Sequence, residues 1–318
     1  MSRLPRIFPR RHVPPHGSGR GLPRMARQRG MAVIAALVVV AAAAVVTAAI
    51  VERQSLLADT LAGERDRVQA KWLLRGGLDW SRVILFNDAR HNAVTRKNAI
   101  WDQPISALEI IAPGDARKAY FSGQIEDEQG KFNLTGLAVR GVVQPAQVAA
   151  LKKLLGSLGV PDGLAGPIAQ RVADSQLRPD GGQAAPGLRS VGDLLGIEGI
   201  SPAMAATLSS YLAVLPKSAT INANTASAEV LSASIPGLDL ARARDLTVQR
   251  DGGRWFTSRA DFFNRLNDPD IVPGNQIGIA SDWFKVTGQV ALDDVVARMQ
   301  ALLYRHGGQP PAIRWIKE

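Results

Sequence analysis

The chain has 318 residues, no cysteine and a formal net charge of +10. That charge is concentrated in residues 1–30, which hold eight arginines and no acidic residue. Removing these eight from the 38 basic residues leaves 30 against 28 acidic residues, a net charge of only +2 for the rest of the chain. The composition therefore excludes disulfides and thiolate metal sites, and it gives no reason to expect nucleic-acid binding by the larger part of the chain.

An uninterrupted apolar segment follows the basic leader. Residues 31–51 contain no ionisable side chain, and Thr47 is the only polar residue among them. As a helix they would cover roughly 30 Å, the thickness of a bilayer's hydrocarbon core, whereas the apolar core of a secretory signal has only about 7–15 residues. We therefore predict a membrane span with the leader in the cytoplasm and the rest exported. A buried core helix is the alternative.

Composition and periodicity predict the elements on both sides of the span. Residues 1–30 are rich in Arg, Pro and Gly, which predicts disorder, and Met25 within them is an alternative translation start. Helical periodicity continues beyond the span, so one helix is predicted over about residues 31–87, with a bend allowed at Gly76 and Gly77. Its outer half should pack on a sheet.

The next segment predicts a loop followed by a β-hairpin. Residues 87–113 are loop-rich, with Trp101 as the expected anchor. Apolar and polar residues alternate over 119–134, which predicts two strands around a turn at Gln129–Gly130. We interpret the acidic residues 126–128 as solvent-exposed beside this turn, with a calcium or partner contact as the alternative.

The pattern then changes to short helices separated by Gly and Pro. Three segments of similar composition, at residues 158–161, 197–202 and 235–239, each precede an alanine-rich helix. Their regular spacing predicts stacked helical hairpins. Asn224 or Thr225 is expected to cap a further helix.

Strand patterns return after the helical segment, over residues 281–290, 295–304 and 313–316. The economical architecture is an α+β fold with an all-helical insertion. The predicted parts are a basic leader (1–30), the span (31–51), the stalk helix with the first part of the domain (52–141), the insertion (142–276) and the strands that complete the domain (277–318).

No combination of residues indicates catalysis. The chain has no nucleophile–base order that stands out, no Gly-rich phosphate loop and no zinc motif, so we predict that it is not an enzyme. The segments at 197–202 and 235–239 resemble helix-hairpin-helix elements, which bind DNA phosphates, but their charges are balanced and favour a structural hairpin. Asp268 and Asp270 could offer oxygen ligands to calcium, although such clusters ordinarily form turns.

The start of the apolar segment resembles the cleavage site of prepilin-class proteins. In that class a peptidase cuts after a Gly and leaves the apolar helix as the new N-terminus; Gly30 and Met31 match these two positions. The class normally has Glu at the fifth mature position, where this chain has Ala35. One subgroup lacks that Glu, and the chain resembles it: the minor pseudopilin K family of type II secretion.

Further motifs match that family in register. They comprise Glu128, Gly130, Lys131 and Asn133 in one segment and Asn222, Asn224 and Thr225 in a second. The family fold is a pilin-like domain interrupted by a helical domain, as predicted above. Family members bind calcium, but the acidic run concerned is reduced here to Asp174 and Asp180, so the metal state stays open, with Asp268 and Asp270 as other candidates.

The resemblance implies a role in protein export. The leader would be removed by prepilin peptidase, the class is also subject to methylation, and the mature chain would stay in the lipid bilayer of the inner membrane with a periplasmic C-terminal domain. Minor pseudopilins I and J and the inner-membrane secretion platform are the implied partners, and the implied position is the pseudopilus tip. A membrane-tethered DNA-binding protein of a competence-type system is the alternative.

Overall fold

The computed structural model describes residues 25–111, 117–179, 181–216, 218–268, 270–271 and 274–318, and the side chains from residue 30 onward. The chain forms two compact units, Met1–Ala62 and Gly63–Glu318. Helix α1 (Met25–His91) belongs to the first unit up to Ala62 and to the second from Gly63.

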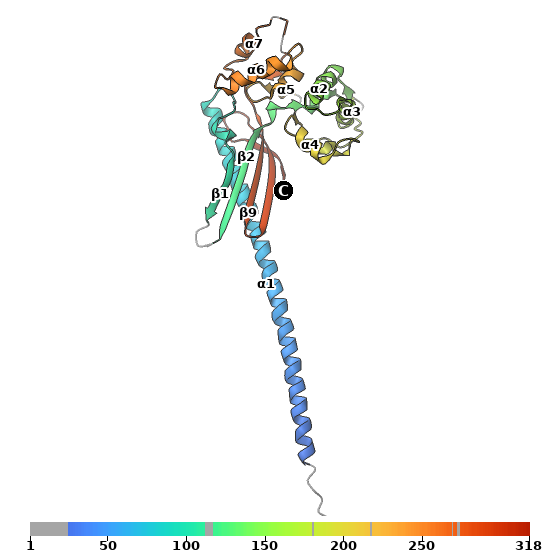
Figure 1. Cartoon of the computed structure of the whole chain (residues 1–318), viewed down its shortest axis with the longest axis vertical. Helices are drawn as coiled ribbons and strands as arrows, with labels where there is room; N and C mark the ends of the chain where they lie inside the picture. The colour runs from blue at the N-terminus through green and yellow to red at the C-terminus, as the bar shows by residue number, and fades with distance from the viewer. Residues whose placement is uncertain (1–24, 112–116, 180, 217, 269, 272–273) are drawn as a thin grey trace, which may run out of the picture. The chain divides into compact units, whose positions relative to one another are not determined.

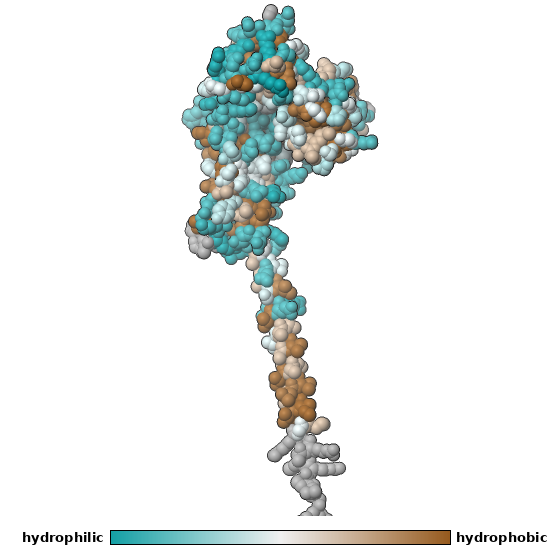
Figure 2. All heavy atoms as spheres, viewed as in Figure 1, coloured by the Kyte–Doolittle hydropathy of each residue, from teal (hydrophilic) through white to brown (hydrophobic). Residues whose placement is uncertain are grey.

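The first unit is described from Met25, where α1 begins. Disorder was predicted up to residue 30, but residues 25–30 are helical, because Met, Ala, Arg and Gln are all good helix formers. From Gly30 to Ala62 every residue is exposed, and Figure 2 shows α1 as mostly brown in its apolar segment, with teal and pale residues among the brown further along the helix. The hydroxyl of Thr47 donates to the Ala43 carbonyl (2.8 Å), so the one polar side chain of the apolar segment is satisfied within the helix.

The second unit is built on a five-stranded antiparallel sheet in the order β1-β2-β9-β10-β11 (Figure 1). The strands are β1 (Ile105–Ile111), β2 (Lys118–Asp127), β9 (Trp283–Leu292), β10 (Val295–Tyr304) and β11 (Ala312–Lys317). Leu74, Leu78 and Leu85 of α1 are at most 2% exposed and share a core with Phe121 of β2 and Phe284 of β9. The outer half of α1 therefore packs on a sheet of its own domain, as predicted.

Helix α1 continues without interruption through Gly76 and Gly77. A Cβ added to Gly77 would lie 2.5 Å from the Phe121 ring, whereas one added to Gly76 would meet nothing within 4 Å. Gly77 therefore lets the helix approach the sheet closely; it does not interrupt the helix.

The predicted hairpin over residues 119–134 is wrong. Strand β2 pairs with β1 and β9, whereas β3 (Phe132–Asn133) pairs in parallel with β6 (Leu212–Ala213). The chain turns out of the sheet at a 3-10 turn, Glu128–Gly130, instead of folding back on itself. The loop predicted over 87–113 is wrong at β1, which lies within these residues. Trp101, the expected anchor of this segment, is buried.

A long segment interrupts the sheet between two neighbouring strands. The chain leaves at Asp127 and returns at Trp283, and Asp127 is the register partner of Phe284. The segment holds α2 (Pro145–Ser157), α3 (Ala165–Asp174), α4 (Pro202–Leu208), α5 (Ala228–Ser234), α6 (Leu240–Asp251) and α7 (Arg259–Leu266). It also holds two-residue strands, namely β3, β4 (Ala138–Val139), β5 (Val142–Val143), β6, β7 (Ile221–Asn222) and β8 (Ile277–Gly278). The boundaries 142 and 276 remain a prediction.

The inserted segment has its own core and forms three hairpins. Helix α2 packs on α3, α4 packs on the 3-10 helix Val191–Gly196, and α5 packs on α6. The connections contain Gly159, Gly199 and Gly237 with φ of 69°, 89° and 82°, a conformation that glycine adopts readily. These are the three segments of similar composition found in the sequence. The predicted cap at Asn224 or Thr225 is wrong: Ser227 caps α5.

Candidate functional site

The residues expected at the peptidase site lie on the apolar part of α1. Gly30, Met31 and Ala35 are exposed, and a Cβ added to Gly30 would meet nothing within 4 Å. Among the described residues, the part of α1 from Gly30 onward is the one candidate for a membrane span, with a mean hydropathy of 2.9 over 18 residues. This part of the chain fits a transmembrane anchor.

Asp127, the last residue of β2, is the centre of a buried hydrogen-bond network. Three side chains donate to its Oδ2: Asn222 Nδ2 (3.0 Å), Thr225 Oγ1 (2.6 Å) and Ser281 Oγ (2.6 Å). The backbone N–H of Gln129 donates to Oδ1 (2.8 Å). Burial raises the pKa of Asp127, and these hydrogen bonds offset that effect only in part. The network joins the end of β2 to the inserted segment and to the residues just before β9.

The second family motif supplies the inserted side of this network. Asn222 is fully buried; its Nδ2 also donates to the Thr95 carbonyl (3.0 Å), and its Oδ1 accepts from the Asn224 N–H (2.9 Å). Asn224 in turn pairs with the backbone of Phe256, donating to its carbonyl (2.9 Å) and accepting from its N–H (2.7 Å). The two asparagines therefore connect the sheet to the core of the inserted helices.

Arg305, after β10, extends the network to α1. Its Nη2 donates to Thr95 Oγ1 (2.7 Å) and to the Ser281 carbonyl (2.7 Å), and its Nη1 forms an ion pair with Asp88 Oδ2 (3.0 Å). Ser281 N–H also donates to Thr95 Oγ1 (3.0 Å). We call Thr95, Asp127, Asn222, Thr225, Ser281 and Arg305 the junction network.

Lys131 and Lys285 neutralise the two glutamates beside the junction network. Lys131 Nζ lies 2.5 Å from Glu128 and 3.0 Å from Glu126, while Lys285 Nζ lies 2.9 Å from Glu126. Burial opposes the charged form of Lys131, but the carboxylates outweigh it and raise its pKa. The solvent-exposed interpretation of residues 126–128 is wrong, because Glu128 and Asp127 are buried and each has defined partners.

The two remaining motif residues fix the path of the chain after the turn. A Cβ on Gly130 would lie 3.0 Å from Thr225 Oγ1 and 3.2 Å from its backbone, so the turn packs closely on the second motif. Asn133 Oδ1 accepts from the N–H groups of Thr135 (3.2 Å) and Leu215 (3.0 Å), and its Nδ2 donates to the Pro216 carbonyl (3.0 Å). All seven predicted motif positions thus lie in or beside one junction.

The arginines of the third hairpin are engaged in contacts within the chain. Arg242 pairs with Asp268 (3.2 Å) and Arg244 with Glu229 (3.6 Å). Arg250 is 3% exposed and donates to the backbone carbonyls that precede α5. A DNA-binding hairpin needs exposed positive charge, so this arrangement favours the structural interpretation.

The candidate metal ligands do not come together in the part of the chain that the structure describes. Asp174 accepts from Gln170 and faces Arg178 at 3.5 Å, and Asp268 faces Arg242. No group of three or more His, Asp or Glu that could hold a metal occurs among the described residues; Asp270 belongs to no such group, and Asp180 lies outside them. Among the described donors, Asp174 and Asp268 are each paired with an arginine and do not form a calcium site with Asp270.

Comparisons with known proteins identify the family. Two family models described as type II secretion system (T2SS), protein K match residues 130–217 and 221–280. The type II secretion system protein K of Pseudomonas aeruginosa is 28% identical over 292 residues, covering 84% of this chain and 86% of that protein. The chain belongs to the protein K family of the type II secretion system.

A solved structure agrees with the protein K fold. A chain of the crystal structure of the GspK-GspI-GspJ complex from the enterotoxigenic Escherichia coli type 2 secretion system matches with a TM-score of 0.57 and 15% identity. The match covers 80% of this chain and 97% of that chain. At this identity the likeness shows the fold.

Several junction residues escaped the sequence analysis. Asp127 had a usable signal: Ala119, Phe121 and Ile125 of β2 are buried at odd positions, so Asp127 continues the inward-facing series. Thr95 and Arg305 had no usable sequence signal. They contact each other across about two hundred residues of sequence, and neither belongs to a periodic pattern.

Proposed function

We propose that this chain is a minor pseudopilin that caps the tip of the type II secretion pseudopilus together with minor pseudopilins I and J. The observation that carries the proposal is the combination of membership in the protein K family with a pilin-like sheet that a helical segment interrupts. A structural, non-catalytic role follows from the family.

The N-terminal part supports insertion into the inner membrane. Eight arginines precede the apolar part of α1, which favours a cytoplasmic N-terminus and a periplasmic second unit. Prepilin peptidase would cut between Gly30 and Met31, so the apolar helix becomes the start of the mature chain.

Ala35 supports placement at the tip. In the prepilin class that this chain resembles, the fifth mature residue is normally a Glu whose carboxylate pairs with the N-terminal ammonium of a neighbouring subunit in lipid, where an unpaired charge is costly. A subunit with Ala35 cannot make that pair to the subunit ahead of it, so the first position suits it best. We expect Ala35→Glu to reduce secretion and the neutral Ala35→Ser to leave it unchanged; wild-type secretion by Ala35→Glu would contradict this placement.

The cleavage site has a matched control on the same helix. Gly30→Ala should retain the leader, whereas Gly63→Ala, at another glycine where an added Cβ meets nothing within 4 Å, should mature normally. Intact-mass measurement of the membrane-extracted chain distinguishes the two products. A normally shortened Gly30→Ala product would rule out prepilin peptidase processing at this bond.

The partners have a direct test. The matching solved chain comes from a complex that contains GspI and GspJ. We therefore expect the full-length chain to copurify with the I and J subunits of its own system from detergent-solubilised membranes. A fully processed, folded chain that elutes without either subunit would refute the tip-complex proposal.

A further inference from the structure

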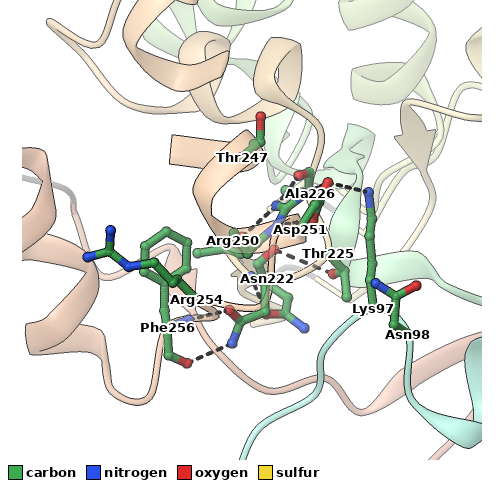
Figure 3. Close-up of polar contacts among 12 residues, drawn as sticks. Lys97, Asn98, Asn222, Thr225, Ala226, Thr247, Arg250, Asp251, Arg254 and Phe256 are labelled. Atoms are coloured by element: carbon green, nitrogen blue, oxygen red, sulfur yellow. Dashed lines mark hydrogen bonds and ion pairs between the residues drawn. The ribbon is translucent and has the colours of Figure 1, made fainter. Parts of the chain in front are cut away.

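A small cavity of about 100 Å³ lies beside the junction network, between the residues that follow α1 and the end of α6. Its charged lining residues are Arg96, Lys97, Arg250 and Asp251, three cations and one anion. Trp255 forms part of the wall, and Figure 3 shows Lys97 reaching from one side towards Asp251 on the other. The cavity therefore has an excess of positive charge.

The one acidic group of the lining is already held by Arg250. The carboxylate of Asp251 accepts from Arg250 Nε (2.7 Å) and from Arg250 Nη2 (3.1 Å), a two-point contact. Lys97 Nζ forms a long ion pair with Asp251 (3.9 Å), beyond hydrogen-bond distance, and it donates no hydrogen bond among the described residues.

Nearby carboxylates therefore neutralise the positive charge of Lys97 only in part. Burial and the charge of Arg250 lower the pKa of Lys97, and the carboxylates of Asp251 and Asp102 offset this only in part. A negative charge placed in the cavity would stabilise the ammonium, so the local electrostatics favour an anion.

Arg96 supplies a second cation to the lining of the cavity. Its guanidinium stacks over the Trp255 ring at 4.1 Å, which fixes the group in place, and it has no acidic partner in the described part of the chain. Figure 3 shows the Arg254 side chain pointing away from Lys97 and Asp251, and Arg254 does not line the cavity. Arg250 contributes charge only, since its Nη1 is already bonded to backbone carbonyls.

We propose that this cavity binds one small oxyanion, held by the Lys97 ammonium and the Arg96 guanidinium. Its volume suits a single carboxylate, phosphate or sulfate group. The anion comes either from an Asp or Glu side chain of a neighbouring subunit or from solution.

Inorganic phosphate and acetate are the probes for the free anion. The full-length chain in detergent micelles is titrated by isothermal calorimetry at constant ionic strength, with Lys97→Met and, as a matched control, Lys152→Met at an exposed lysine away from the cavity. We expect at least tenfold weaker binding for Lys97→Met and unchanged binding for Lys152→Met. Measurable binding that is equally tight for wild type and Lys97→Met would overturn the proposal.

A second arm identifies the source of the anion and rests on the proposed assembly with I and J. If a partner carboxylate occupies the cavity, Lys97→Met weakens copurification of I and J. Phosphate then also displaces I and J, whereas chloride at the same ionic strength does not. If the anion is free, copurification is unchanged while phosphate binding is still lost. No binding of either probe, together with unchanged copurification, overturns the proposal without affecting the assignment as a minor pseudopilin.

Discussion

Replacing Asn222 with Ala tests whether the junction network holds the two cores of the second unit together. Among the described residues, Asn222 is the one whose side chain contacts Asp127, Thr95 and Ser281 at the same time, and it lies in the inserted segment, whereas Asp127 lies in the sheet. One core contains the helices of the inserted segment and the other contains α1 and the sheet. Asn222→Ala removes the amide and leaves the backbone otherwise unchanged.

The expected cost follows from the groups that lose their partners. The Thr95 carbonyl and the Asn224 N–H are buried and lose the hydrogen bonds that the Asn222 side chain makes with them. Each buried group left unsatisfied costs about 1–3 kcal/mol, so we expect a loss of about 2–6 kcal/mol in the free energy of unfolding. That is a large part of the stability of a typical domain, which is about 5–15 kcal/mol.

Denaturant unfolding of the full-length chain in micelles, followed by tryptophan fluorescence, measures this loss. Asn264→Ala is the matched control, because Asn264 is exposed on α7 and should change stability by less than about 0.5 kcal/mol. A second variant, Ser281→Ala, should show a coupling energy of about 0.5–3 kcal/mol with Asn222→Ala if both belong to one network. Equal stabilities of Asn222→Ala and Asn264→Ala would refute the network as the link between the cores.

Three further outcomes are expected. Gly77→Ala should destabilise the chain by about 1–3 kcal/mol relative to Gly76→Ala, because only the first places a Cβ against the Phe121 ring; equal melting temperatures would contradict the close approach of α1. Lys131→Met should cost about 3–5 kcal/mol by leaving buried carboxylate charge without its nearest cation, while wild-type unfolding would show that Lys285 suffices. Because burial raises the pKa of Asp127, the folded chain binds its proton more tightly than the unfolded chain. The unfolding free energy should therefore rise as pH falls through that raised pKa, and this rise should be absent from the Asp127→Asn variant. Identical pH dependence of the two chains would contradict the raised pKa.

The sequence predicted the parts of the fold whose signal is periodic and local. The apolar segment of α1 was expected from its unbroken run of apolar residues, β9 and β10 from their strand patterns, and the three hairpins from their recurring glycine-containing segments, all at nearly their observed positions. The strand β1 was missed, since its residues are mostly exposed and Ala107 interrupts its regular backbone with a φ of 49°. An edge strand of this kind has little alternation to detect.

The hairpin error has a different cause. Alternation continues through β2 and then resumes at Phe132, so the pattern alone looks like two strands about a turn. What decides the pairing is the partner of Asp127: Phe284 lies opposite it in the sheet, more than 150 residues later in the sequence. Local sequence contains no information about such a return.

The position of the family motifs also limits what a motif match implies. The predicted motif residues from Glu128 to Thr225 lie where the chain leaves the sheet or where the inserted segment contacts that point, and most are buried. Closing so long a segment between adjacent strands costs conformational entropy, and a buried polar network satisfied at every donor can hold its two ends in one register. A match to these motifs therefore indicates the interrupted fold. Residues that contact partner subunits must lie on exposed surfaces, where substitutions leave the junction intact, and so a chain can keep the motifs while it changes its partners.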